Sequence, residues 1–239
     1  MKAHGVKLTL SESIRLRQQE GRFPVISEIK VRSEKEGDLL RGRDPAQLAR
    51  QMAGQPVAGI SVVTEPEHFG GSMDILRAVA GAVSVPILHK DFITTERQVE
   101  ESAAYGASAV LLITAMLEAD RMIRLIEKAR GLGLESLVEA HNLEEIERVS
   151  RLQFDLMGIN NRDITIFEVD DDDVGRTETL ARACRSGRPL ISESSIGSAA
   201  DVRRAGKSGA DAVLVGTALL KPGSPVELLS EMIAVGWPV

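Results

Sequence analysis

Two residues near the start of the chain place an acid and an amine at the end of an apolar run. Glu28 and Lys30 stand two positions apart in Val25-Ile26-Ser27-Glu28-Ile29-Lys30. Side chains alternate in direction along a β-strand, so a strand here directs both groups to the same side. A carboxylate beside an ammonium can move protons or hold an anionic substrate. The pair is therefore the first candidate for chemistry.

Five later apolar runs also end in polar residues. These ends are Lys90-Asp91, Glu139 with His141-Asn142, Asn160-Asn161-Arg162-Asp163, Glu193-Ser194-Ser195 and Gly216-Thr217. If the runs are parallel strands, their carboxyl ends meet at one edge, where charges without a partner are costly. A buried network of structural ion pairs is the alternative interpretation. Because all the donors gather at one end, we favour an active site.

The elements that must position these residues follow from the rhythm of the sequence. Short runs rich in Val, Ile and Leu alternate with amphipathic stretches, as in parallel strands joined by crossover helices. Asp44-Pro45 and Asn142 predict the starts of two helices. The strands are expected at Val25–Lys30, Gly59–Thr64, Pro86–Lys90, Ala109–Thr114, Glu135–Ala140, Asp155–Asn160, Leu190–Glu193 and Ala212–Gly216.

Eight strands in a chain of 239 residues indicate an α/β protein with a (β/α)8 TIM barrel fold. We expect a single domain over residues 1–239, with the barrel at 25–239 and a short N-terminal extension at 1–24. Within the extension, Lys7–Glu20 predicts a helix that lies across one end of the barrel.

The loops after the seventh and eighth predicted strands suggest a phosphate site. They read Ser194-Ser195-Ile196-Gly197 and Val215-Gly216-Thr217. In this fold these loops often bind phosphate, because small residues let backbone N–H groups approach the anion. The sequence therefore predicts a phosphorylated small-molecule substrate.

Composition excludes several other classes. The net charge of −6 and the single Trp and Tyr argue against nucleic-acid binding. No apolar run reaches the roughly 20 residues of a membrane span, so we expect a cytoplasmic protein without membrane contact. The single cysteine, Cys184, leaves no intrachain disulfide and no cysteine metal site. The acidic run Asp170–Asp173 lacks the spacing of a calcium loop, and a solvated loop is favoured over a cation site.

Several motifs together resemble the indole-3-glycerol phosphate synthase family of tryptophan biosynthesis. They fall in the family's order between about residues 25 and 220. They are Val25–Lys30, Thr64-Glu65-Pro66-Glu67-His68-Phe69-Gly70-Gly71-Ser72, Lys90-Asp91-Phe92-Ile93, Leu137-Val138-Glu139, Gly158-Ile159-Asn160-Asn161-Arg162-Asp163 and Ser192-Glu193-Ser194. The resemblance implies a carboxy-lyase that closes the indole ring of 1-(2-carboxyphenylamino)-1-deoxyribulose 5-phosphate with loss of CO₂ and water. It also implies that the reaction needs no cofactor and no metal.

The resemblance further implies a role for each matching residue. Lys90 is the acid for ring closure, Glu139 the acid or base of dehydration with Lys30 assisting, and Glu28 the partner that orients Lys30. The other implied substrate contacts are Asn160, Glu193 and Ser194 for polar groups, Arg162 for the carboxylate, Phe69, Phe92 and Leu111 for the aromatic ring, and Lys30, Ser33, Ser195, Gly216 and Thr217 for the phosphate. Core packing is the alternative for the three apolar residues. The oligomeric state is open, and a monomer is favoured.

Three departures from the family pattern leave a second function open. Ser33-Glu34-Lys35 stands where the family usually has Ser-Pro-Ser, Ser195 replaces a usual glycine, and the N-terminal extension is short. Glu34 and Glu36 add negative charge near the phosphate, and Lys35 can offset it. A paralogue acting on a ring-substituted N-aryl sugar phosphate is therefore the second hypothesis. A barrel that only binds a phosphate or a partner is the third, although every implied catalytic residue is present.

Overall fold

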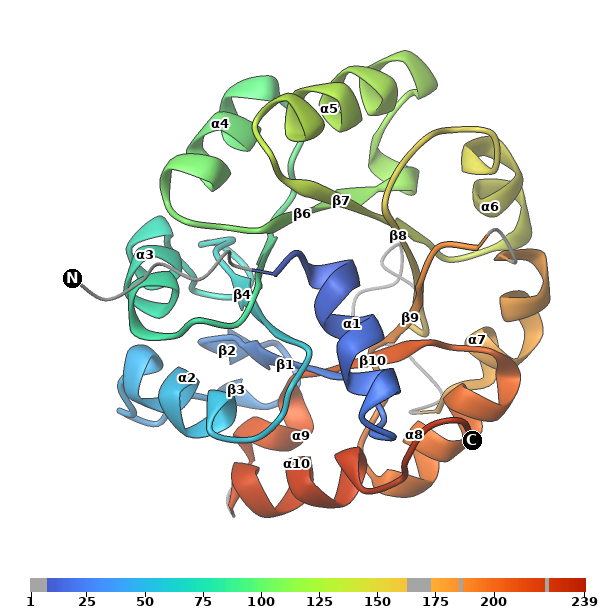
Figure 1. Cartoon of the computed structure of the whole chain (residues 1–239). Helices are drawn as coiled ribbons and strands as arrows, with labels where there is room; N and C mark the ends of the chain where they lie inside the picture. The colour runs from blue at the N-terminus through green and yellow to red at the C-terminus, as the bar shows by residue number, and fades with distance from the viewer. Residues whose placement is uncertain (1–7, 163–172, 185–186, 222–223) are drawn as a thin grey trace.

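The computed structural model describes residues 8–162, 173–184, 187–221 and 224–239. Eight parallel strands close into a barrel in the order β1-β10-β9-β8-β7-β6-β5-β4 (Figure 1). They are β1 (Val25–Ile29), β4 (Gly59–Val63), β5 (Ile87–Lys90), β6 (Ala109–Ile113), β7 (Glu135–Ala140), β8 (Leu156–Asn160), β9 (Leu190–Glu193) and β10 (Ala212–Val215). The predicted TIM barrel and all eight strands are confirmed, with ends that differ by one residue at most.

The register of the barrel brings functional candidates to one level. Asn160 of β8 pairs with Glu193 of β9, and Glu139 of β7 pairs with Gly158 of β8. Because the strands are parallel, these residues all approach the same, carboxyl-terminal end of the barrel.

Helices surround the barrel and cover its outer face (Figure 1). The covering helices are α2 (Pro45–Ala53), α3 (Met73–Ala82), α4 (Glu96–Ala104), α5 (Ala119–Gly131), α6 (Leu143–Val149), α7 (Gly175–Leu180), α8 (Ala199–Ser208) and α10 (Pro225–Ile233). Short turns of helix also follow three strands or helices, as η1 (Thr114–Met116), η2 (Ala181–Cys184) and α9 (Thr217–Leu220). The predicted caps are confirmed, since the Asp44 and Asn142 side chains accept hydrogen bonds from the first turns of α2 and α6.

The N-terminal helix α1 (Leu10–Gln19) lies across the amino-terminal end of the barrel, as the sequence predicts (Figure 1). Its Leu10 and Ile14 side chains are fully buried among inward-facing strand residues. The Ser11 backbone N–H donates to the Glu135 carboxylate over 2.9 Å, and Arg15 pairs with Asp211 over 2.9 Å. The helix therefore covers the end of the barrel opposite the predicted active site.

The first βα loop contains a small hairpin that the sequence pattern did not indicate. Its strands are β2 (Arg32–Ser33) and β3 (Gly37–Asp38), which pair antiparallel. The Arg32 N–H donates to the Phe69 carbonyl oxygen over 3.1 Å, which joins the hairpin to the loop after β4. Strands of two residues carry no readable periodicity, so only the structure reveals them.

The predictions on the acidic run and on membrane spans can be compared with the structure only for the described residues. Of the predicted acidic run, Asp170–Asp172 lies outside the described residues, as does Asp163. Among the described residues, no helix combines the length and the apolar character that a membrane span requires.

Candidate active site

One ammonium group lies among three carboxylates at the carboxyl end of the barrel. The Lys90 Nζ atom lies 3.0 Å from Glu193 Oε2 and 3.5 Å from Glu28 Oε2. Burial by itself lowers the pKa of Lys90, but the charges of Glu193, Glu28 and Glu139 outweigh it and raise that pKa above its ordinary value. Lys90 is therefore held as an ammonium, a proton donor in fixed geometry.

Glu193 is the most deeply buried member of this group. Burial raises the pKa of its carboxyl to about 7, with Glu139 and Glu28 adding repulsion and Lys90 opposing the rise. Oε1 of Glu193 has no hydrogen-bond partner among the described residues. A β-carbon at Gly158 would overlap this oxygen, so the backbone of β8 leaves the room that the carboxylate occupies.

Glu28 lies between the two lysines of the site. Its carboxylate is 3.9 Å from Lys30 Nζ, farther than from Lys90, and the Ser61 hydroxyl donates to it over 3.4 Å. Lys30 Nζ also lies over the Phe69 ring, 5.5 Å from its centre. Glu28 therefore balances the charge of both lysines, whereas the sequence indicated a pairing with Lys30 alone.

Glu139 has a charged partner that was not among the predicted site residues. His141 Nε2 lies 3.3 Å from Glu139 Oε1, and His141 Nδ1 lies 3.1 Å from Glu145 Oε2. Burial works against ionisation of Glu139, but contacts with His141, Lys90 and Asn160 prevail and lower its pKa. A signal was visible in the sequence, because residues 139 and 141 share a direction along the strand.

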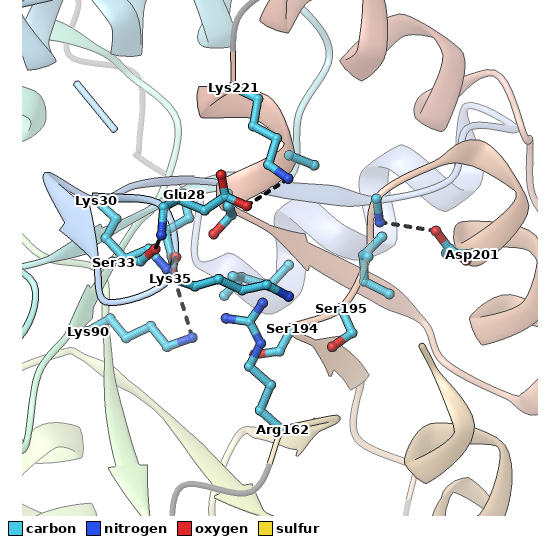
Figure 2. A pocket seen from close by; sticks show the side chains of 16 residues that line it. Glu28, Lys30, Ser33, Lys35, Lys90, Arg162, Ser194, Ser195, Asp201 and Lys221 are labelled. Atoms are coloured by element: carbon cyan, nitrogen blue, oxygen red, sulfur yellow. Dashed lines mark hydrogen bonds and ion pairs between the residues drawn. The ribbon is translucent and has the colours of Figure 1, made fainter. Parts of the chain in front are cut away.

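A polar cavity of about 290 Å³ opens beside Lys90 (Figure 2). In Figure 2 the side chains of Lys35, Lys90 and Arg162 converge on this space, opposite the loop that carries Ser194 and Ser195. The residues that line it are Glu28, Lys30, Ser33, Lys35, Glu36, Lys90, Arg162, Ser194, Ser195, Ile196, Gly197, Asp201, Leu214, Thr217, Ala218 and Lys221. Its cations, hydroxyls and small residues suit an anionic group such as a phosphate.

A second cavity of about 430 Å³ adjoins the first and is mainly apolar. Phe69, Phe92 and Leu111 line it together. Its other lining residues are Glu28, Lys30, Val63, Glu65, Lys90, Asp91, Ile113, Ala115, Met116, Glu139, Asn160, Arg162 and Ser194. Five residues line both cavities, so the two spaces meet beside them, with the Lys90 ammonium among them: Glu28, Lys30, Lys90, Arg162 and Ser194.

The residues that the resemblance implies as phosphate contacts do not all line the polar cavity. Ser33, Ser195 and Thr217 line the polar cavity, whereas Gly216 is not among its described lining residues. A β-carbon at Gly216 would overlap the Glu28 carboxylate, so Gly216 provides space for that side chain. Ser194 and Ser195 adopt φ angles of 65° and 57°, a left-handed conformation that is costly for residues with a β-carbon. The strain that the loss of glycine at position 195 predicts is therefore present.

The hairpin after β1 carries charged side chains, and only some of them lie near the polar cavity as the sequence predicted. Glu36 lines the polar cavity, and its carboxylate lies 2.9 Å from Lys221 Nζ. This contact lowers the pKa of Glu36. Glu34 is not among the cavity residues, and its carboxylate lies 3.6 Å from His68. Lys221, which carried no motif, therefore joins Lys35 in offsetting the acid in the cavity.

Backbone hydrogen bonds to Glu65 order the loop that carries Phe69. The Glu65 carboxylate accepts from the N–H groups of Glu67, His68 and Phe69 over 2.8–3.0 Å. Glu65, Glu67 and His68 also form the one described group whose side chains are close enough to share a metal ion. Because the Glu65 oxygens already accept three hydrogen bonds, the group is explained by loop structure.

Comparisons with known proteins bear on the fold and the family of the chain. An N-acetylmannosamine-6-phosphate 2-epimerase from Clostridium perfringens has a similar structure, with a TM-score of 0.64 at 15% identity over 84% of this chain and 89% of that one. This likeness shows the barrel fold alone.

Sequence relatives are more specific. The pattern of the family described as Indole-3-glycerol phosphate synthase matches residues 6–230. Proteins of that name from Pyrococcus furiosus and Nocardioides sp. are 42% and 46% identical to this chain. The two alignments cover 94% and 88% of this chain, and 96% and 80% of those proteins. The chain therefore belongs to the indole-3-glycerol phosphate synthase family, carboxy-lyases of tryptophan biosynthesis.

Proposed function

We propose that the chain converts 1-(2-carboxyphenylamino)-1-deoxyribulose 5-phosphate to indole-3-glycerol phosphate, with release of CO₂ and water. The observation that carries the proposal is the meeting of an apolar and a polar cavity at Lys90. A substrate with an aromatic ring at one end and a phosphate at the other fits such a pair of spaces. Its ketone then lies between them, beside the ammonium.

Ring closure requires a proton at the ketone oxygen. The ring carbon that bears the carboxylate attacks the ketone carbon, a carbon–carbon bond forms, and Lys90 protonates the developing oxyanion. Arg162 lines both cavities and is the proposed partner of the substrate carboxylate. Loss of CO₂ then returns the electron pair of the broken bond to the ring and restores its aromaticity.

Dehydration completes the indole. Lys30 is the proposed acid that protonates the departing hydroxyl, and Glu139 the base that takes the proton from the neighbouring carbon. Asn160, Glu193 and Ser194 are the proposed contacts of the substrate's remaining polar groups. The phosphate is proposed to bind Lys30, Ser33, Ser195 and Thr217, with Gly216 shaping this end of the barrel.

The test is a fluorescence assay of the purified protein with this substrate. Indole-3-glycerol phosphate fluoresces as an indole, so turnover appears as a rising signal. Absence of product where the Pyrococcus furiosus relative turns over would contradict the proposal. A cytoplasmic location, a monomeric state and a single domain stay predictions that fractionation, sedimentation and limited proteolysis can check.

A second candidate is the same chemistry on a ring-substituted N-aryl sugar phosphate. The left-handed Ser195 and the charged hairpin, where the family usually has glycine and Ser-Pro-Ser, favour it. Turnover of the plain substrate and of ring-methylated and ring-chlorinated analogues separates the two candidates. Equal or better use of the plain substrate rules against the second.

A further inference from the structure

His141 lies between two carboxylates just beyond the end of β7. Its side chain is only 4% exposed, with Nε2 at 3.3 Å from Glu139 Oε1 and Nδ1 at 3.1 Å from Glu145 Oε2. The Nε2 contact is an ion pair and does not have the direction of a hydrogen bond. Both ring nitrogens of this buried histidine therefore face negatively charged oxygens.

The outer carboxylate is fixed by the start of α6. Glu145 Oε2 accepts from the His141 backbone N–H over 2.9 Å, and Glu145 Oε1 accepts from the Asn142 side-chain amide over 2.8 Å. Asn142 in turn accepts from the Glu145 N–H as the N-cap of the helix. The imidazole is thus tied to a rigid helix terminus on one side and to Glu139 on the other.

This geometry determines the charge of the ring. A neutral imidazole has one N–H donor and one lone pair, so one of its nitrogens would bring a lone pair within 3.3 Å of a carboxylate oxygen. An imidazolium carries an N–H group on each nitrogen, and its positive charge attracts both carboxylates even where the contact does not lie along an N–H bond. Two cations also act on this group: Arg176 of α7 donates to the His141 carbonyl oxygen over 3.2 Å, and the charge of Lys90 of β5 acts on Glu139. Arg148 of α6 donates to the Thr114 carbonyl oxygen of η1.

We propose that His141 is a positioning residue which, as an imidazolium, holds Glu139 as an oriented carboxylate and so makes it a base in the reaction. The role of Glu139 in turnover rests on the proposed function, whereas the charge of His141 does not. Glu139 lines the apolar cavity, and its Oε2 atom is buried with no hydrogen-bond partner among the described residues. The Glu139 carboxylate is the proposed acceptor of the substrate proton, and its Oε1 atom faces His141.

The acid–base properties of the pair agree with this assignment. Burial alone lowers the pKa of His141, but contacts with Glu139 and Glu145 prevail and raise it to about 9. The same contact helps to lower the pKa of Glu139. At neutral pH the pair is therefore an imidazolium and a carboxylate, each stabilising the charge of the other.

The first experiment measures the charge without substrate. The chain has four histidines, so the His141 signals in a side-chain ¹⁵N spectrum can be identified by their loss in His141→Gln. We expect His141 to titrate near pH 9, and Glu139→Gln to lower its pKa by at least about one unit. A His141 ring that is neutral at pH 7 would overturn the proposal, whatever the protein catalyses.

The second experiment measures the consequence in turnover. In His141→Gln, we expect kcat to fall about 10- to 100-fold with little change in KM, and the acidic limb of the kcat/KM profile to move up by about one pH unit or more. Glu145→Gln should move that limb the same way by less. The matched control is His89→Gln, because the buried His89 ring lies 2.7 Å from the Thr64 and Ser102 hydroxyls and makes no contact with Glu139.

The outcomes separate the two proposals. An acidic limb that stays in place in His141→Gln contradicts the positioning role even if the wild-type enzyme is active. A wild-type protein that makes no indole contradicts the proposed function, yet the ¹⁵N titration still tests His141. If His141→Gln does not fold, the His141 signals are identified by their shift in Glu139→Gln, and the titration in wild-type and Glu139→Gln protein decides.

Discussion

Gly158 and Glu193 are fitted to each other across β8 and β9, because a β-carbon at residue 158 would overlap the Glu193 carboxylate. The same carboxylate lies 3.0 Å from Lys90 Nζ. The position of the Lys90 ammonium, the proposed acid of ring closure, therefore depends on the missing side chain of Gly158, which lies three strands away in the barrel.

Gly158→Ala should displace Glu193 and move Lys90 with it. We expect kcat to fall about tenfold or more, because small errors in catalytic geometry are costly, and the free energy of unfolding to drop by about 1–3 kcal/mol. Steady-state kinetics and urea unfolding measure the two effects. Gly81→Ala is the control, since Gly81 lies in α3 with open space around it. It should gain about 0.5–1 kcal/mol and keep its kcat.

Lys90→Met should remove the proton that ring closure needs. We expect a fall in kcat of about 10²- to 10⁴-fold with the barrel still folded, as judged by circular dichroism. Folding survives because Glu193, with a pKa of about 7, can take up a proton once its cation is gone. Lys128→Met is the control, because Lys128 pairs with acids of α4 outside both cavities. A folded Lys90→Met protein that turns over normally would show that another group is the acid.

Glu193 should make the protein less stable as the pH rises from about 4.5 to about 7. Its carboxyl has a pKa of about 7 in the fold against 4.5 ordinarily, so the folded state binds more protons in this interval. Raising the pH removes that proton and the stability linked to it. Urea unfolding at several pH values should show a flatter profile for Glu193→Gln. An unchanged slope would place the proton on another group.

Glu36 should weaken substrate binding because it adds a negative charge to the polar cavity, where the substrate phosphate is proposed to bind. Glu36→Gln leaves the charge of Lys221 for the phosphate, and we expect KM to fall roughly two- to fivefold at low salt and less at high salt. Glu34→Gln is the matched control, since Glu34 contacts His68 and does not line the cavity. Equal effects of the two substitutions would show that only net charge matters.

Ser195→Gly should relieve strain at a φ angle of 57°. Removing the left-handed serine should raise the free energy of unfolding by about 1–2 kcal/mol. The greater conformational freedom of glycine in the unfolded chain lowers it by about 0.4–1 kcal/mol, so we expect a net stabilisation of about 0.5 kcal/mol. Thermal unfolding measures it. Ser150→Gly, at a φ of −54°, lacks this strain and should be destabilised. A loss of stability in both variants would mean that the Ser195 hydroxyl outweighs its backbone strain.

Much of the fold and part of the site could be predicted from the sequence. Unbroken apolar runs such as Ala109–Ile113 reveal buried parallel strands, because both faces of each strand must be covered. Once eight strands are placed, Lys90, Glu139 and Glu193 must approach one another, since each lies at the last or second-last position of its strand at the same rim. Their positions follow from topology alone.

Other features depend on contacts that no local pattern encodes. The ion pair of Glu36 and Lys221 joins residues 185 positions apart in sequence, through a hairpin too short to have a pattern. The role of Gly216 as space for Glu28 depends on how two adjacent strands face each other. In the sequence His141 is only a polar residue near a strand end. Its proposed role depends on its contacts with the Glu139 and Glu145 carboxylates, which only the structure shows.

The position of α1 has a practical consequence for using the enzyme outside the cell. The polar cavity, where we propose that the substrate binds, lies at the rim that carries Lys90, while α1 occupies the opposite rim through Leu10 and Ile14. A resin, an electrode or a partner enzyme coupled to the exposed face of α1 would hold every molecule with the carboxyl-terminal rim of its barrel facing the solution. Coupling through α1 would therefore immobilise all molecules in one orientation and leave each proposed active site open to diffusing substrate.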